Sequence, residues 1–168
     1  MRRWLLLLSL FTLSIEAKTY VFFSDRDPVV SHLIEWIDRE EEGIDVAIYS
    51  FTHKKIEEAL LRANARGVRV RLILDGSSEK MARDIFERGI LDVALVVSPK
   101  KAFRPLFHHK FILFHHNKGA RPWVWTGSFN LSNAAEKKNF ENVVLMDTKS
   151  VFKDFNNYFN KTLEIIRK

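Results

Sequence analysis

The chain has 168 residues, enough for one domain with a hydrophobic core and too few for two domains of ordinary size. Hydrophobic residues make up 46% and charged residues 29%, which excludes a disordered chain and a membrane bundle. There is no cysteine, so disulfides, thiolate zinc sites, iron–sulfur clusters and cysteine nucleophiles are excluded. The excess of basic residues, 27 Lys and Arg against 21 Asp and Glu, favours an anionic partner such as nucleic acid or a phospholipid surface.

Residues 1–17 have the pattern of a secretory signal peptide. Arg2 and Arg3 are followed by twelve mostly apolar residues, and Ala17 supplies the small residue at the end of a cleavage site. Twelve helical residues reach only about 18 Å, which is short of a hydrocarbon core of about 30 Å. We therefore expect export to the periplasm or the cell exterior and a mature domain over residues 18–168; an uncleaved membrane anchor is the alternative.

The rest of the sequence alternates between a two-residue and a helical period, which is typical of an α/β domain. Strands are predicted over residues 19–23, 44–49, 68–74, 93–97, 107–114, 123–126 and 142–146. Helices are predicted between Pro28 and Gly43, between Thr52 and Gly67, around residues 81–86 before Gly89, and over residues 131–138 and 152–163. Asp27 and Thr52 are expected to cap the first two helices, and residues 115–121 to form a polar loop.

Residues 93–135 contain no Asp or Glu. An even spread of the acidic residues would place about five there. Four of the six histidines lie in this segment, together with six basic residues: Lys100, Lys101, Arg104, Lys110, Lys118 and Arg121. An acid-free patch of this kind suits a phosphodiester or dianionic substrate, and a solvated basic loop is the alternative.

A candidate site lies within and just after this segment. His108 and Lys110 are two residues apart, so on a strand their side chains face the same way. Ser128 and Asn130 follow a glycine that permits close backbone approach, and they offer short donors for phosphate oxygens. Glu141 is a carboxylate that can orient an imidazole nitrogen. Each signal alone is weak, because a histidine beside a lysine is usually structural.

Histidines 108, 109, 115 and 116 also raise the question of a zinc site. On a strand, His108 and His115 stand roughly 23 Å apart, and their odd spacing sends them to opposite faces. One tetrahedral ion does not bridge that distance, so no metal ligands are predicted. Trp123 and Trp125 alternate with an apolar residue and are predicted to belong to the core.

Taken together, these segments resemble the phospholipase D superfamily, in its short single-motif form that includes bacterial endonucleases and mitochondrial cardiolipin hydrolases. Residues 44–52 and 67–71 resemble the first half of that family, and residues 108–110 begin its HxKxxxxD motif. Residues 126–130 resemble its GSxN segment, and residues 139–142 its trailing Glu element. The resemblance implies a single domain with a mixed β-sheet flanked by helices on both faces.

The resemblance also implies an activity that needs neither metal nor cofactor. His108 attacks the phosphorus of a phosphodiester to form a phosphohistidine, which water then releases. Lys110, Ser128 and Asn130 hold the non-bridging oxygens. Because the chain has one motif, two identical subunits would each give one His108 to a shared site; no obligate protein partner is inferred.

One residue departs from the family pattern, because His115 stands where the motif has Asp. In the family that Asp is thought to support the site, so we expect His115→Asp to preserve or raise activity. Three functions remain open: an exported nuclease acting on DNA or RNA, which is our first choice; a phospholipid phosphodiesterase of the cardiolipin type; and a non-catalytic anion-binding protein.

Overall fold

The computed structural model describes three stretches of the chain, residues 16–90, 92–96 and 106–168. The predicted signal peptide lies outside them except for its last two residues, as do the basic residues Lys100, Lys101 and Arg104. Within the described stretches, no helix is both long enough and apolar enough to cross a membrane.

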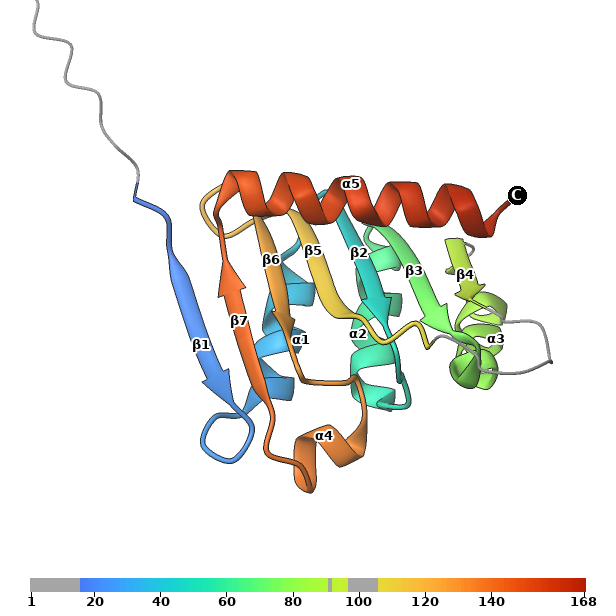
Figure 1. Ribbon diagram of the computed structural model, residues 1–168, viewed down its shortest axis with the longest axis horizontal. Helices are drawn as coiled ribbons and strands as arrows, with labels where there is room; N and C mark the ends of the chain where they lie inside the picture. Colours follow the sequence, from blue (N-terminus) through green and yellow to red (C-terminus); the bar gives the residue numbers. More distant parts are fainter. Residues whose placement is uncertain (1–15, 91, 97–105) are drawn as a thin grey trace, which may run out of the picture.

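A mixed seven-stranded β-sheet forms the middle layer of the described molecule (Figure 1). The strand order is β1-β7-β6-β5-β2-β3-β4; β2, β3 and β4 run parallel, and the other neighbouring pairs are antiparallel. The strands are β1 (Thr19–Phe23), β2 (Gly43–Ile48), β3 (Arg69–Asp75), β4 (Asp92–Val96), β5 (Lys110–Asn117), β6 (Arg121–Gly127) and β7 (Asn142–Met146).

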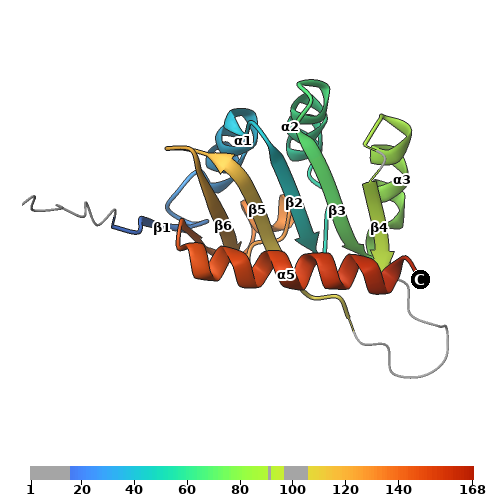
Figure 2. The ribbon, with the colours of Figure 1, turned by 90° about the horizontal axis from the view of Figure 1, so that it is seen from above.

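Helices cover both faces of the sheet, as Figure 2 shows from above. The first three pack on one face, and the long C-terminal helix crosses the other. The helices are α1 (Val29–Arg39), α2 (Lys54–Ala65), α3 (Glu79–Glu87), α4 (Asn133–Lys137) and α5 (Lys149–Ile166), with a 3-10 turn at Gly76–Ser78. The expected α/β domain, with a mixed sheet between helices, is confirmed.

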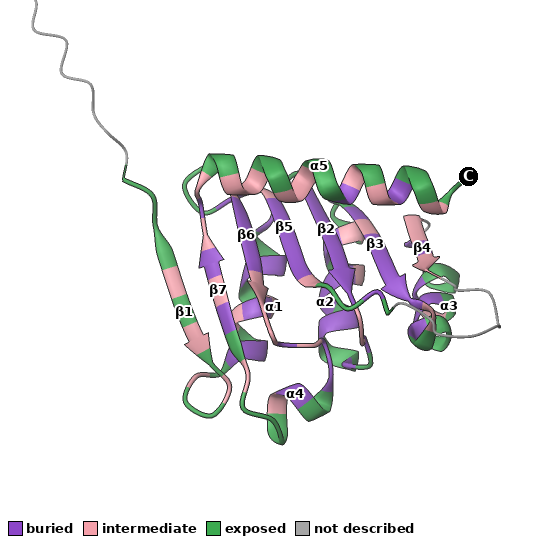
Figure 3. Ribbon diagram, viewed as in Figure 1, coloured by how far each residue is buried: buried purple, intermediate pink, exposed green. Residues whose placement is uncertain are grey.

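The larger core layer lies between the sheet and helices α1 to α3. Ile44, Val46 and Ile48 point into it from alternate positions of β2, which is buried along its whole length (Figure 3). Trp123 and Trp125 of β6 lie in the same layer, which confirms their prediction as core residues. Burial of each such side chain stabilises the fold by about 1.5–3 kcal/mol.

The smaller core layer lies between the sheet and α5. Phe159 and Leu163 of α5 pack there against Ala47, Leu113 and Val124, which occupy the opposite face of β2, β5 and β6. The strand period of two therefore assigns each side chain to one layer. The helical period of α5, with Phe152, Phe155, Phe159 and Leu163 on one side, matches this layer as predicted.

The predicted helix stops are confirmed at two glycines. Gly67 and Gly89 have φ angles of +91° and +106°, in the left-handed region that glycine adopts without a Cβ clash. Each follows a helix and precedes the next strand, so the chain reverses there.

The predicted cap and end of the first helix are wrong. Asp27 accepts a hydrogen bond from the backbone N of Phe23 at 2.8 Å instead of capping α1, which follows Pro28. The helix ends at Arg39, whereas Gly43 is the first residue of β2. The carboxylate of Asp27 thus stabilises the turn after β1 and does not cap the helix.

The predicted cap of the second helix is also wrong. His53, not Thr52, precedes α2, and it makes no side-chain cap hydrogen bond. The backbone N of Thr52 donates to Leu131 O at 2.9 Å, so the residue joins the loop after β6 instead.

The predicted polar loop at residues 115–121 is shorter than expected. Strand β5 continues to Asn117, and the turn to β6 spans residues 118–120. The strand accommodates a polar end because Asn117 Nδ2 donates to Trp36 O at 2.9 Å and to Glu40 Oε2 at 3.0 Å. Buried polar groups that find partners of this kind cost little.

Candidate active site

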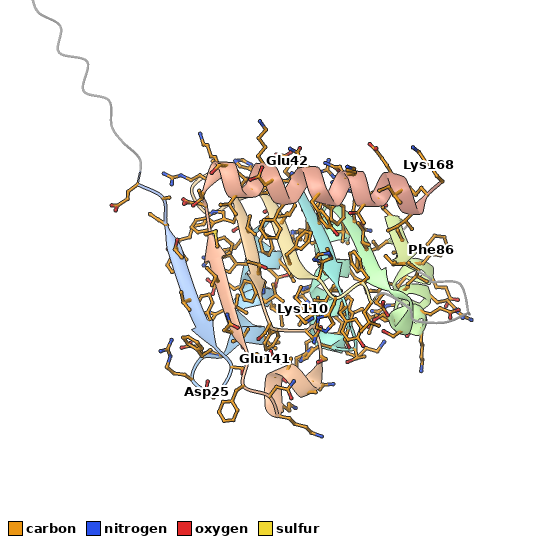
Figure 4. All side chains as sticks on the ribbon, viewed as in Figure 1. Asp25, Glu42, Phe86, Lys110, Glu141 and Lys168 are labelled. Atoms are coloured by element: carbon orange, nitrogen blue, oxygen red, sulfur yellow. The ribbon has the colours of Figure 1, made fainter. Side chains whose placement is uncertain are left out.

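Four strand ends meet at one edge of the sheet and carry the residues selected from the sequence. Strands β2 and β6 end there, and β5 and β7 begin there, because β5 is antiparallel to β2 and β6, and β6 to β7. Lys110 opens β5, Ser128 follows β6, and Glu141 precedes β7. Figure 4 shows Lys110 and Glu141 at this edge, away from α5.

His108 and Lys110 lie together as their spacing predicts. Lys110 Nζ is 3.2 Å from His108 Nδ1 and 3.3 Å from Nε2, and it donates to His108 O at 3.1 Å. The ring of Tyr49, the residue after β2, lies against the imidazole with centroids 4.6 Å apart. Lys110 Nζ stands 5.3 Å from the centre of the same ring. An exposed imidazole and a half-buried ammonium therefore share one aromatic neighbour.

The electrostatics of Lys110 suit an anion. Partial burial lowers the pKa of its amine, and the carboxylate of Glu141 acts in the opposite direction. An ammonium with less water around it attracts a phosphate oxygen more strongly than a fully solvated one does.

The side chains of Ser128 and Glu141 are hydrogen-bonded to each other between the end of β6 and the start of β7. Ser128 Oγ donates to Glu141 Oε2 and accepts from the backbone N of Asn142 at 3.1 Å. The backbone N of Ser128 donates to Asn142 O at 3.0 Å. We call these contacts the serine–glutamate clamp. It places a hydroxyl and a carboxylate side by side at the sheet edge.

Gly127 is the residue that lets the clamp form. A Cβ added at this position would lie 2.1 Å from Asn142 O and 2.9 Å from Asn142 C, which is closer than Cβ atoms approach such atoms in proteins. The glycine predicted to permit close backbone approach therefore does so against β7.

The second oxygen of Glu141 is also engaged. Asn139 Nδ2 donates to Glu141 Oε1 at 2.8 Å, and Ser24 Oγ accepts from the backbone N of Glu141 at 2.9 Å. Within the described chain, both carboxylate oxygens thus bind residues other than a histidine. The orientation of an imidazole by Glu141 stays a prediction.

Asn130 presents its amide at the same edge. Its Oδ1 accepts from the backbone N of Ser50 at 3.3 Å, which fixes the amide orientation. Its Nδ2 has no hydrogen-bond partner among the described residues and remains a donor for an incoming ligand.

His109, the middle residue of the motif, faces the other way. Its Nε2 lies 2.7 Å from the hydroxyl of Tyr158 on α5, and its ring packs edge-on against Phe107 and Phe111. Partial burial lowers the pKa of His109, and the positive charges of Lys110 and His108 lower it further. The motif therefore gives one histidine to the sheet edge and one to the contact with α5.

The comparisons with known proteins agree with this geometry. A family model described as "Cardiolipin synthase, PLD-like domain" matches residues 33–163. The chain belongs to the phospholipase D-like family. A phospholipase D of Rickettsia felis is 34% identical over 129 residues, which cover 74% of this chain and 60% of the relative.

Two solved structures share the fold of this phospholipase D-like chain. Nuc from Salmonella typhimurium, a phospholipase D family member, has a TM-score of 0.71 and 27% identity, over 87% of this chain and 93% of that one. NucT from Helicobacter pylori has a TM-score of 0.77 and 26% identity, over 89% and 97%. The chain thus spans about 60% of the curated phospholipase D but nearly all of these two structures.

In this phospholipase D-like chain, the residue that replaces the motif's aspartate lies far from the sheet edge. His115 Nε2 donates to Asp45 Oδ2 at 2.7 Å, and Arg71 donates to both oxygens of Asp45 at 2.6 and 2.7 Å. Burial would raise the pKa of Asp45, but the hydrogen bonds and charges of His115 and Arg71 outweigh it and lower the pKa. An added carboxylate would therefore face Asp45, whereas the effect of His115→Asp on activity stays a prediction.

The other histidine at this end is separate from His115. His116 lies 3.5 Å from Glu41 through its Nδ1. Across the described residues, no three His, Asp or Glu side chains are grouped so as to hold a metal ion.

Two residues of the site were not singled out from the sequence. Tyr49 directly follows β2, and a polar aromatic residue at the end of a buried strand is the signal that could have identified it. Ser24 had no local signal, because its partners Asn139 and Glu141 are more than a hundred residues away in the chain.

Proposed function

We propose that the protein is an exported, metal-independent phosphodiesterase that cleaves nucleic acid through a phosphohistidine on His108. The observation that carries the proposal is the contact between His108 and Lys110 at the sheet edge, where the imidazole is exposed and the ammonium is within hydrogen-bond distance. Asn130 and the serine–glutamate clamp complete that edge. A nucleophile beside a cation and fixed donors is the arrangement that phosphoryl transfer needs.

The reaction would proceed in two displacements. A nitrogen of His108 forms a bond to phosphorus while the bond from phosphorus to the leaving oxygen breaks, and that oxygen takes a proton from a general acid. Water then attacks phosphorus, the phosphorus–nitrogen bond breaks, and the proton of the water returns to the group that acted as acid. Lys110 and Asn130 would bind the non-bridging oxygens in both steps.

The general acid is expected from a second copy of the chain. In the described chain, His109 faces α5 and His115 pairs with Asp45, so neither stands beside His108 on its exposed side. A homodimer about a two-fold axis would bring two His108 side chains to one site. The catalytic unit in this proposal is therefore the pair.

The choice of nucleic acid rests on charge and on the extent of the structural match. The chain has a net charge of +6, and its acid-free segment, residues 93–135, contains His108, Lys110, Ser128 and Asn130. A positively charged surface binds the phosphate backbone of nucleic acid whatever its sequence. The two Nuc structures align over almost their full length, whereas the curated phospholipase D is much longer than the matched region.

A phospholipid substrate is the second candidate, and one observation favours it. Phe140, the residue before Glu141, is 88% exposed. An exposed Phe ring beside the site would offer an apolar contact to the headgroup boundary of a lipid surface.

The test is cleavage in EDTA of plasmid DNA, single-stranded RNA and cardiolipin vesicles, each in a separate reaction. We expect nucleic acid to be cut and the activity of His108→Ala to fall by about a thousandfold or more. His116→Ala, a substitution at the far end of β5, is the matched control and should leave the rate unchanged. Hydrolysis of cardiolipin alone would show that the substrate is a phospholipid. No turnover of any substrate would favour a non-catalytic anion-binding protein. Loss of activity in EDTA with recovery on zinc addition would overturn the metal-independent mechanism.

A further inference from the structure

Tyr49 contacts both reacting groups of the candidate site. Its ring centroid is 4.6 Å from that of His108, with the planes at 51°, and 5.3 Å from Lys110 Nζ. These are the two side chains that would attack and bind a phosphate. His108 precedes β5 and Lys110 is its first residue, whereas Tyr49 directly follows β2.

Hydrogen bonds hold both backbone groups of Tyr49, and a third holds the nearby residue Phe51. Its N donates to His109 O at 2.8 Å, which continues the β2–β5 ladder beyond its last paired residues. Ser78 Oγ donates to Tyr49 O and accepts from the N of Phe51, both at 3.2 Å. The ring is thus attached to a rigid part of the sheet edge, not to a free loop.

An aromatic face suits both of its neighbours. The ring quadrupole attracts a cation that lies within about 6 Å of the centroid, as Lys110 does. The imidazole of His108 gains positive charge as its nitrogen bonds to phosphorus, and the same ring would stabilise that charge. A ring that touches both groups also limits how far each can swing away from the other.

We propose that Tyr49 is a positioning residue, whose aromatic ring keeps the His108 imidazole and the Lys110 ammonium side by side for phosphoryl transfer. The catalytic part of this inference rests on the function proposed above. The positioning of the two side chains depends on contacts of the Tyr49 ring, so we expect the hydroxyl of Tyr49 to be dispensable for it.

The experiment compares Tyr49→Phe, which keeps the ring, with Tyr49→Leu, which removes it. Tyr158→Phe is the matched control, because it removes a tyrosine hydroxyl next to His109 rather than His108. The rate is measured with bis(p-nitrophenyl) phosphate in EDTA. Tyr49→Leu should lower kcat by about 10- to 100-fold with KM changed less than about threefold, whereas Tyr49→Phe and Tyr158→Phe should stay within about threefold of the wild-type kcat.

A second measurement does not depend on turnover. Proton NMR of the His108 imidazole, assigned by its loss in His108→Gln, should show a ring-current shift that Tyr49→Phe keeps and Tyr49→Leu loses. If Tyr49→Leu does not fold, Tyr49→Met replaces it, since methionine fills a similar space without an aromatic ring.

The outcomes separate this inference from the proposed function. An inactive wild type with the expected ring-current pattern would overturn the function and support the placement of the ring. Equal kcat in Tyr49→Leu and wild type, or an equal loss in Tyr49→Phe and Tyr49→Leu, would overturn the positioning role. A ring-current shift unaffected by Tyr49→Leu would also overturn it.

Discussion

His115 shows how one substitution changes the charge balance of a buried cluster. Asp45 is fully buried and is bound by His115 on one side and by both donors of Arg71 on the other. Two donors and one carboxylate leave no place for a second carboxylate. The residue that departs from the family motif therefore contributes to the core under α5 and not to the sheet edge.

We predict that His115→Asp destabilises the protein by about 3 kcal/mol, because it replaces a donor to a buried carboxylate with a like charge. For a chain of this size, that loss lowers the melting temperature by roughly 6–12 °C, measured by circular dichroism. His115→Gln, whose amide nitrogen lies near the position of His115 Nε2 and can still donate to Asp45, is the control and should lose less than half as much. A melting temperature of His115→Asp equal to that of the wild type would refute the role assigned to the cluster.

Gly127 gives a second prediction on the scale of one residue. In Gly127→Ala the new Cβ would collide with the backbone of β7, so the strands must separate and the serine–glutamate clamp must shift. Because a displacement of about 1 Å can cost about a hundredfold in rate, we expect phosphodiesterase activity to fall by that order.

The comparison for this variant is Gly43→Ala. Its nearest neighbour is the end of the flexible side chain of Arg69, at 3.0 Å, which can move aside. Activity in Gly43→Ala should remain near the wild-type level. A Gly127→Ala protein as active as Gly43→Ala would show that the clamp is not needed.

On the scale of elements, α5 is held to the sheet by polar as well as apolar contacts. Arg71 donates to Asn160 Oδ1 at 3.0 Å and lies 4.9 Å from the ring centre of Phe159, and His109 is hydrogen-bonded to Tyr158. The buried carboxylate of Asp45 holds Arg71 in place for these contacts. Its ionisation therefore bears on the packing of the whole helix.

We predict that stability falls with acidification because of Asp45. Its pKa is lower in the folded protein than the usual value, so its contribution is complete above the unfolded pKa of about 3.9 and is lost as pH falls through the folded pKa. Asp45→Asn should be about 3 kcal/mol less stable at pH 7, since it leaves Arg71 without its counter-charge. Thermal unfolding between about pH 2.5 and pH 7 should show this difference shrinking toward the acid end. A difference that is constant with pH would contradict the assignment.

The elements that follow local rules could be predicted from the sequence. The strand runs alternate or are continuously apolar, and Gly67 and Gly89 mark helix ends by their own conformational freedom. His108 and Lys110 lie together as their two-residue spacing predicts, although the strand predicted to begin at residue 107 begins only at Lys110. These features depend on neighbours within a few residues.

The features that the sequence did not predict depend on distant partners. Strand β5 extends through His116 because its backbone N donates to Glu40 Oε1 at 2.7 Å, across 76 residues of sequence. Ser24 contacts Asn139 O and Glu141 N, which lie 115 and 117 residues further along the chain. Asp27 is a local exception, because its carboxylate accepts from Phe23 N, four residues back, rather than capping the helix after it. Local propensity carries no information on which of several polar partners a carboxylate meets.

On the scale of the whole molecule, the proposed pairing of two chains has a quantitative consequence. If each site needs one His108 from each subunit, a wild-type chain paired with a His108→Ala chain is inactive. After co-refolding with free exchange, activity should follow the square of the wild-type fraction, so an equal mixture should retain about a quarter of the activity. Mixing without exchange is the control and should retain about half.

A linear dependence after proven exchange would show that each subunit is self-sufficient. The general acid would then have to come from the same chain, and the two-fold arrangement would not be part of the mechanism.

The pairing of β1 with β7 also bears on how the protein is made. Thr19 lies opposite Met146, so β1 finds its partner strand only after the chain has been translated as far as Met146. At synthesis rates of about 5–20 residues per second, the interval is roughly 6 to 25 seconds. During that time the side of the sheet that β7 and β1 later close is unpaired. The nascent chain can already include His108 while Ser128 and Glu141 have not yet been added. The site is therefore assembled only after β7 has been made, because Ser128 and Glu141, which flank β6 and β7, have to join His108.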